Sequence, residues 1–151
     1  MTLDGYGHYG DKRAWMGIDP GITTGVAFVR DEDGEVIGSA NLKPDSLAEK
    51  LDETIRRFHR AGYTLTCVVE IMPRYGKMSP LSAALESVRS VILEVVEGTY
   101  SLDVFRVTPG EWKPSRVART TALRRGHYSP HERDAIRMAL YVRAREASRG
   151  N

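Results

Sequence analysis

The chain has 151 residues, of which 41% are hydrophobic and 28% charged, and its formal net charge at pH 7 is +2. This composition is typical of one globular domain with a proper core. No apolar run approaches the ~20 residues of a membrane span, and the N-terminal segment lacks the apolar centre of a secretory signal, so we expect a cytoplasmic protein without a membrane partner. The single cysteine, Cys67, excludes disulfide frameworks and cysteine-rich zinc sites.

The first part of the chain predicts three strands in antiparallel succession. Residues 14–19 and 25–30 are short apolar runs, and DEDG at residues 31–34 is a strong hairpin turn before a third run, EVIGSANL at residues 35–42. The residues that precede these strands, 1–13, are expected to form an N-terminal tail.

A helix and a buried strand are expected next. Ser46 and Glu49 have the spacing of a capping box, and apolar residues then recur at helical spacing up to Gly62. LTCVVE at residues 65–70 is a continuous apolar run, typical of a strand buried on both faces. Cys67 lies within this run and is therefore expected in the core.

The helix expected at residues 79–97 has an apolar arc wider than the ~100° of an ordinary surface helix, which indicates that it buries two of its sides. Its opposite side carries Arg89 among other polar residues. A fifth strand is expected at residues 103–107. Ser129 and Glu132 form a capping box for a last helix, which runs to about residue 148.

The order of these elements, β-β-β-α-β-α-β-α, predicts an α/β domain. Its mixed five-stranded sheet would contain three antiparallel strands, then two parallel strands reached through helical crossovers, with helices flanking the sheet.

Positive charge is concentrated in the last third of the chain. Residues 104–151 hold 11 of the 22 Lys and Arg residues but only 4 of the 20 Asp and Glu residues. A loop expected at residues 112–128 supplies much of this charge, and it is equally explained as a surface that follows phosphates or as a solvated loop. Its basic residues are Lys113, Arg116, Arg119, Arg124 and Arg125.

Four potential metal ligands are expected to meet at one corner of the sheet. Asp19 ends the first strand, and Glu70 ends the buried fourth strand, where burial would raise the pKa of a carboxyl group unless a cation is near. His131 and Asp134 are three residues apart and so project from one face of the last helix. Three carboxylates and an imidazole suit Mg²⁺ or Mn²⁺, and two such ions are the usual arrangement for phosphodiester cleavage. Each residue alone has a structural explanation; their combination indicates a nuclease.

With these residues in place, the sequence resembles the RuvC family of Holliday-junction resolvases, whose fold is RNase H-like. The family's second acid closes a buried strand, as Glu70 does, and its last ligands occur as His131, Asp134 and Ala135 do here. The resemblance covers residues 14 to about 145. Its opening motif, GIDPG-TG, matches in Gly17, Ile18, Asp19, Pro20, Gly21, Thr24 and Gly25.

The resemblance implies a single RNase H-like nuclease domain over residues 14–151 that resolves four-way DNA junctions by paired symmetric cuts. Asp19 would bridge two ions, Mg²⁺ or Mn²⁺, while Glu70 would hold one of them and His131 with Asp134 the other. The family's lysine after the fifth strand corresponds to Lys113, which could stabilise charge in the transition state. Trp112 stands where the family has an aliphatic residue.

The resemblance also implies how DNA is held. An aromatic wedge that stacks at the strand-exchange point would be Tyr75, with Arg74 and Lys77 beside it. The family's glycine-rich segment with a second lysine has no match, and Arg116, Arg119 or Arg124 would take its place. Arg125 is a further residue expected to contact DNA. Because a four-way junction has two-fold symmetry, a homodimer is implied, and the wide apolar helix at residues 79–97 would supply its interface.

Three other readings of the sequence stay open. The turn DPGITTG resembles the phosphate loop of actin-like ATPases and sugar kinases, although no second such hairpin occurs in the chain. A module with the same fold could bind junctions without cutting them. A nuclease could act instead on RNA:DNA hybrids, flaps or replication forks.

Overall fold

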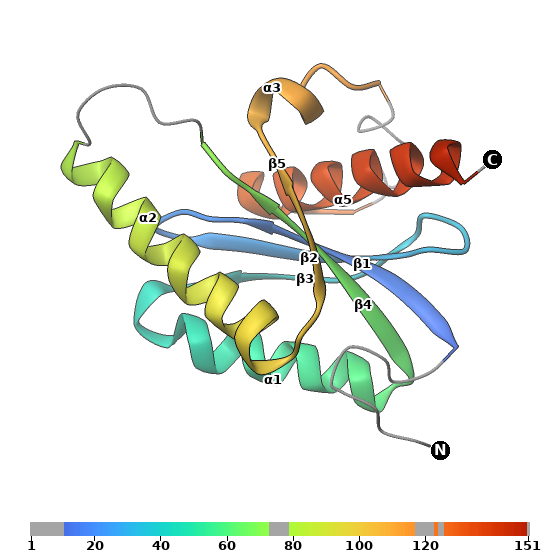
Figure 1. Ribbon diagram of the computed structural model, residues 1–151, viewed down its shortest axis with the longest axis horizontal. Helices are drawn as coiled ribbons and strands as arrows, with labels where there is room; N and C mark the ends of the chain where they lie inside the picture. Colours follow the sequence, from blue (N-terminus) through green and yellow to red (C-terminus); the bar gives the residue numbers. More distant parts are fainter. Residues whose placement is uncertain (1–10, 73–78, 117–122, 124–125, 151) are drawn as a thin grey trace.

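A five-stranded mixed sheet forms the centre of the protein (Figure 1). The computed structural model describes residues 11–72, 79–116, 123 and 126–150. The strand order is β3-β2-β1-β4-β5; β1, β2 and β3 pair antiparallel, while β4 pairs parallel with β1 and β5 parallel with β4. The predicted α/β fold is confirmed. The strands are β1 (Lys12–Asp19), β2 (Thr24–Arg30), β3 (Val36–Leu42), β4 (Tyr63–Glu70) and β5 (Asp103–Val107).

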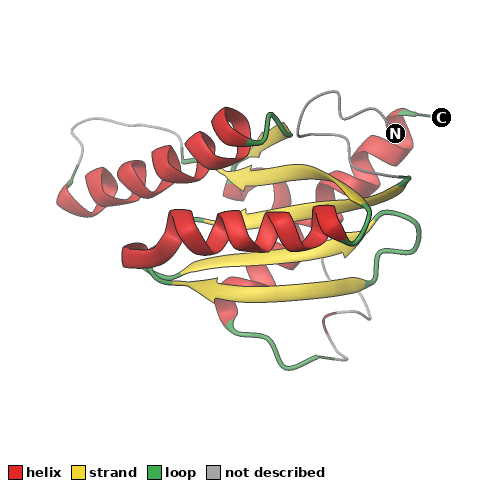
Figure 2. Cartoon of the chain, turned by 90° about the horizontal axis from the view of Figure 1, so that it is seen from below, coloured by secondary structure: helices red, strands yellow, loops and turns green. Residues whose placement is uncertain are grey.

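Helices cover both faces of the sheet (Figures 1 and 2). On one face lie α1 and α2, and on the other lies α5, so the molecule has three layers. In the part of the chain that the structure describes, no helix is both long and apolar enough to cross a membrane. The helical elements are η1 (Pro44–Ser46), α1 (Leu47–Arg60), α2 (Pro80–Leu93), a π-helical turn η2 (Glu94–Thr99), α3 (Pro109–Trp112) and α5 (Pro130–Arg149).

Two local predictions need correction. β1 begins at Lys12 because Lys12 and Arg13 pair with the start of β4, so these two residues belong to the sheet and not to the predicted tail. The capping box expected at Ser46 is wrong: among the residues described, its side chain makes no capping hydrogen bond. The turn η1 leads directly into α1, and the backbone N–H of Leu47 already donates to the carbonyl of Pro44. The box at Ser129 and Glu132 is confirmed.

Alternation along the strands divides the core between the two faces. Met16, Ile18, Cys67 and Val69 pack toward α1 and α2, and Cys67 is completely buried, as predicted. Gly17 and Val68, which lie between these residues on the two strands, face α5 instead. Both central strands, β1 and β4, are therefore covered on both sides.

Two glycines allow α5 to lie directly on the sheet. A Cβ atom at Gly17 would lie 2.0 Å from the backbone oxygen of Ala135, and one at Gly25 would lie 2.2 Å from the backbone oxygen of His131. Real Cβ atoms do not approach backbone this closely, so only glycine fits at either position. The glycines of the GIDPG-TG motif thus set the height of the first turns of α5 above β1 and β2.

The first turn of α5 is also tied to β3, the edge strand. The Glu132 carboxylate accepts hydrogen bonds from the Ser39 hydroxyl and, at 3.3 Å, from the Asn41 amide. The Ser129 hydroxyl donates to the Asn41 side-chain oxygen at 2.9 Å. These bonds fix the rotation of the helix and therefore the direction in which its other first-turn side chains point.

Candidate functional site

Asp19 and Glu70 end two neighbouring parallel strands. Ile18 pairs with Val69 in the ladder between β1 and β4, so Asp19 and Glu70 follow at the same level. The residues two positions earlier in each strand face α5, and alternation therefore directs both carboxylates toward that helix. Adjacent strands lie about 4.8 Å apart, which makes these two acids close neighbours.

The first turns of α5 bring His131 and Asp134 to the same end of the sheet. His131 Nδ1 lies 3.4 Å from Asp19 Oδ2. The side chain of His131 is 46% exposed, whereas that of Asp19 is only 11% exposed, so the pair joins a solvent-facing imidazole to a buried carboxyl group. The negative charge of Asp134 acts on both Asp19 and Glu70. The structure thus brings the four predicted ligands to the same end of the sheet.

Burial and like charges oppose ionisation of these acids. Burial, together with the charges of Glu70 and Asp134, raises the pKa of Asp19 to about 6, although the hydrogen bond to His131 acts in the opposite direction. The pKa of Glu70 is also raised, chiefly by burial, against the lowering effects of the Trp112 hydrogen bond and the Lys113 charge. A cation among the carboxylates would remove this penalty.

The donor atoms suit a hard divalent cation, but they do not form a closed cage. Within the described residues, no group of three or more Asp, Glu, His or Cys side chains is arranged closely enough to hold a metal ion. Carboxylate oxygens with one imidazole nitrogen are ligands that Mg²⁺ and Mn²⁺ accept, so the residues fit such ions chemically.

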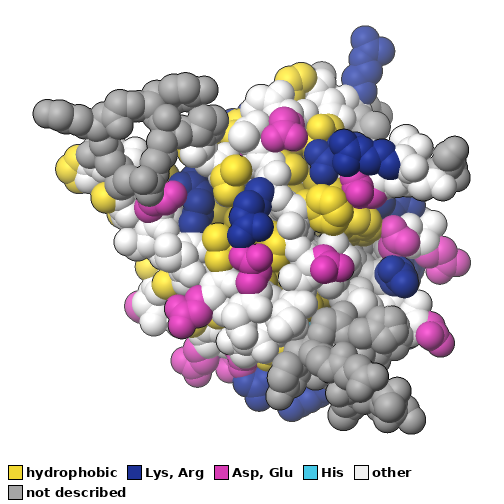
Figure 3. All heavy atoms as spheres, in the orientation of Figure 1, with side chains coloured by type: hydrophobic (Ala, Val, Ile, Leu, Met, Phe, Trp, Pro, Cys, Tyr) yellow, Lys and Arg dark blue, Asp and Glu magenta, His cyan; other side chains and the backbone are white. Residues whose placement is uncertain are grey.

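Lys113 lies beside this group, at the end of α3. Its side chain is exposed, and its positive charge acts on Glu70 and lowers the pKa of that residue. Arg116 follows and is also exposed. The other residues predicted to contact DNA lie outside the described part of the chain: Arg74, Tyr75, Lys77, Arg119, Arg124 and Arg125. On the face drawn in Figure 3, the Lys and Arg side chains of the described residues are interspersed with Asp and Glu.

Two residues that contact Glu70 were not predicted from the sequence. The Trp112 indole donates from Nε1 to Glu70 Oε2 at 2.8 Å. Arg89, which the pattern of α2 places on its polar side, is instead buried, and its Nε donates to the backbone carbonyl of Glu70 at 3.2 Å. The sequence held one indication of this contact, a single arginine on a largely apolar helix. It did not show that the arginine would bond to the carbonyl of Glu70.

Replacing Arg89 with methionine is expected to destabilise the fold by about 1–3 kcal/mol, because the Glu70 carbonyl loses a buried donor. Urea denaturation measures this change. The control is Arg60→Met at the exposed end of α1, which should change stability by less than about 0.5 kcal/mol. Equal stabilities of the two variants would show that the bond from Arg89 contributes nothing.

The chain has an RNase H-like fold, with the mixed sheet order described above and helices on both faces. Two solved structures of RuvC from Thermus thermophilus share it. The complex with a Holliday junction substrate superposes with a TM-score of 0.73 at 19% identity, and the other structure with 0.70 at 18%. Each superposition covers 91% of this chain and 96% of the RuvC chain. No family model and no curated protein matches the sequence.

Proposed function

We propose that the protein is a metal-dependent, structure-selective endodeoxyribonuclease that resolves four-way DNA junctions in the cytoplasm by paired symmetric cuts. The observation that carries this proposal is the gathering of Asp19, Glu70, His131 and Asp134 at one end of a sheet with the RuvC fold. One of the similar RuvC structures contains a Holliday junction substrate, which supports branched DNA as the ligand class.

In this proposal Asp19, Glu70, His131 and Asp134 would hold two Mg²⁺ or Mn²⁺ ions, and Asp19 would contribute to the binding of both. Such ions supply Lewis-acid activation of the scissile phosphate and of the attacking water. Asp19 is suited to the shared position because Glu70 lies on the neighbouring strand and His131 lies within 3.4 Å. Lys113, whose charge reaches Glu70, would stabilise negative charge that develops on the phosphate.

The exposed arginine beyond α3, Arg116, would contact phosphates of the DNA backbone. The other residues predicted to contact DNA are part of the same proposal. Tyr75 would stack on a base, and phosphates would be bound by Arg74, Lys77, Arg119, Arg124 and Arg125. Binding through phosphate contacts weakens steeply as salt rises, so all affinities need to be compared at one ionic strength.

Cleavage of a labelled four-way junction tests the proposal. The purified protein should cut the junction with Mg²⁺ or Mn²⁺, and mapping should place the two cuts at positions related by the two-fold symmetry of the junction. Binding without metal-dependent cutting would favour a junction-binding module. Faster cutting of forks, flaps or RNA:DNA hybrids in competition would assign the site to another nuclease substrate, and tight ATP binding would favour the ATPase reading.

Paired cuts require two active sites, and we propose a homodimer that forms through α2. An apolar groove of about 360 Å³ supports this face: it is lined by α2 from Ala84 to Val91, by η1 and the start of α1, and by Ile22 of the β1–β2 turn. Leu81, in the first turn of α2, is 58% exposed, and Ile22 is 69% exposed. Both are large apolar side chains that a second copy would cover.

Ala84→Glu is expected to weaken dimerisation at least about 10-fold, because it places a charge in the apolar groove. Ala84 is exposed, and glutamate is a good helix former, so the monomer should stay folded. Sedimentation equilibrium measures the dissociation constant. The matched control is Ala83→Glu, an exposed position one residue earlier that lies outside the groove. If both variants dimerise equally, this face is not the interface.

A further inference from the structure

Trp112 is a completely buried tryptophan whose polar atom is directed at the candidate site. It ends the short helix α3 and packs with Val68 of β4 and with Met138 and Val142 of α5. Its indole Nε1 donates to Glu70 Oε2 at 2.8 Å, a short bond to a carboxylate. Because the ring is enclosed on all sides, this N–H is a fixed donor, and it limits the rotation of the Glu70 side chain.

Two positively charged side chains, those of Arg137 and Lys113, lie over the ring of Trp112. The guanidinium carbon of Arg137 lies 4.9 Å from the ring centroid, and Lys113 Nζ lies 5.6 Å from it. Both distances are within the range of a cation–π interaction. Arg137 also donates from Nη2 to the Lys113 carbonyl at 3.1 Å, and its Nη1 lies 3.8 Å from Asp134 Oδ1. Trp112 thus contacts Glu70 and Lys113 directly, and it is linked to Asp134 through Arg137.

We propose that Trp112 is a positioning residue of the candidate metal centre, an inference that rests on the proposed nuclease function. Its N–H holds Oε2 of Glu70, which would leave Oε1 available to a cation. Its ring holds Arg137 and Lys113 in place and, through Arg137, sets the position of Asp134. Removal of the N–H should therefore lower metal affinity even when the core stays filled. Groups that orient metal ligands typically contribute 10–100-fold to affinity or activity.

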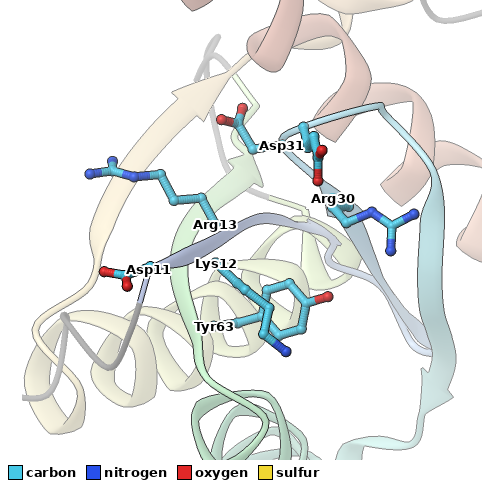
Figure 4. Close-up of a pocket in the computed structure, with 7 residues that line it drawn as sticks. Asp11, Lys12, Arg13, Arg30, Asp31 and Tyr63 are labelled. Atoms are coloured by element: carbon cyan, nitrogen blue, oxygen red, sulfur yellow. The ribbon is translucent and has the colours of Figure 1, made fainter.

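The chain supplies a matched control in its other tryptophan. Trp15 also donates its indole N–H to a carboxylate, Asp31 Oδ1, at 2.8 Å. Asp31 lies at the opposite end of the sheet, where it lines a separate hollow with Lys12, Arg13 and Tyr63 (Figure 4). Trp15→Phe therefore removes the same kind of bond and a similar ring, at a place without candidate ligands.

The test compares Trp112→Phe with Trp15→Phe. Isothermal titration with Mn²⁺, without DNA, should show about 10-fold weaker binding for Trp112→Phe and no change for Trp15→Phe. Under single-turnover conditions, the rate of junction cutting should fall about 10–100-fold for Trp112→Phe, while its junction affinity in Ca²⁺ stays at the wild-type value. Equal Mn²⁺ affinities and rates of the two variants would overturn the proposal.

A second measurement applies if Trp112→Phe does not fold. In Trp15→Phe protein, Trp112 is the remaining tryptophan, and its fluorescence should change on addition of Mn²⁺. Glu70→Gln in the same background should abolish that response. The positioning role would be overturned if Trp112 fluorescence did not change on addition of Mn²⁺, or if the change persisted in the Glu70→Gln variant.

The two proposals fail in different ways. If the wild-type protein binds Mn²⁺ in a Trp112-dependent manner but cuts no DNA, the nuclease function is wrong and the positioning role stands. If it cuts junctions and Trp112→Phe behaves like Trp15→Phe, the positioning role is wrong and the nuclease function stands. Absence of any Mn²⁺ binding would remove both.

Discussion

Asparagine in place of Asp19 is expected to abolish metal-dependent cleavage of a four-way junction and, at the same time, to raise the melting temperature of the metal-free protein at neutral pH. Under the proposed function, cleavage is lost because a neutral amide would not replace a carboxylate that serves both cations. Stability rises because the ionised carboxylate of Asp19 is buried beside Glu70 and Asp134. A residue that only supported the fold would lower both quantities when replaced.

The gain in stability has a defined pH dependence. The pKa of Asp19 is raised from 3.8 to about 6 in the folded protein. Below about pH 4, Asp19 is protonated in the folded and unfolded states and contributes nothing. Between about pH 4 and pH 6 only the unfolded chain loses the proton, so stability falls as pH rises; above about pH 6 the full penalty, at most about 3 kcal/mol, is present. The difference between Asp19→Asn and wild type should grow across this window.

Thermal melts in EDTA from pH 4 to pH 8 measure this difference, and Asp33→Asn is a control of opposite sign. The bond from Arg30 lowers the pKa of Asp33 to about 2, so its ionised form stabilises the folded state above about pH 4. Asp33→Asn should therefore lower stability at neutral pH and leave cleavage unchanged. Continued cutting by Asp19→Asn, or an unchanged melting temperature at pH 7, would contradict the assigned position of Asp19.

Replacing Gly25 with alanine is expected to lower the free energy of unfolding by about 3 kcal/mol or more. The new Cβ would lie 2.2 Å from the backbone oxygen and 2.8 Å from the Cβ of His131. Backbone cannot yield as a flexible side chain does, so α5 must move away from β2, and overpacking of this kind is costly. Because His131 and Asp134 move with the helix, Mn²⁺ affinity should fall together with stability. Urea denaturation and calorimetric titration measure the two effects.

Gly110→Ala provides the matched control for this substitution. Gly110 lies in α3, and among the described residues no atom lies within 4 Å of the point that a Cβ atom would occupy there. Alanine at this position should be neutral or stabilising by up to about 1 kcal/mol, since it restricts the unfolded chain. A Gly25→Ala protein as stable as Gly110→Ala would mean that α5 does not rest on β2 as closely as described.

The strand ends could be predicted from the sequence because they depend on local pattern. Apolar runs that stop at Asp19 and Glu70 predict the strand boundaries, and the capping box at Ser129 predicts the start of α5. The helical crossover into β4 predicts a parallel strand, and because parallel strands end at the same edge of a sheet, the proximity of Asp19 and Glu70 follows as well. This part of the site required no knowledge of side-chain packing.

The contacts around Glu70 could not be predicted, because they join segments that are distant along the chain. Trp112 follows Glu70 by 42 positions, and Arg89 follows it by 19. An apolar ring at the end of a four-residue helix predicts burial, but not the direction of its N–H. Arg89 was placed on a polar side because helical periodicity treats arginine as solvent-facing, whereas its long side chain reaches a carbonyl beneath the end of β4.

The contact between α5 and the sheet has a consequence for genome searches. Gly17 and Gly25 fit because a helix backbone lies against them, so any chain that keeps this contact needs both glycines, whether or not it cleaves nucleic acid. Matches to GIDPG-TG should accordingly be scored as a signature of architecture. Under the proposed function, Asp19, Glu70, His131 and Asp134 form a separate criterion, and their joint presence selects the chains in which nuclease activity should be assayed.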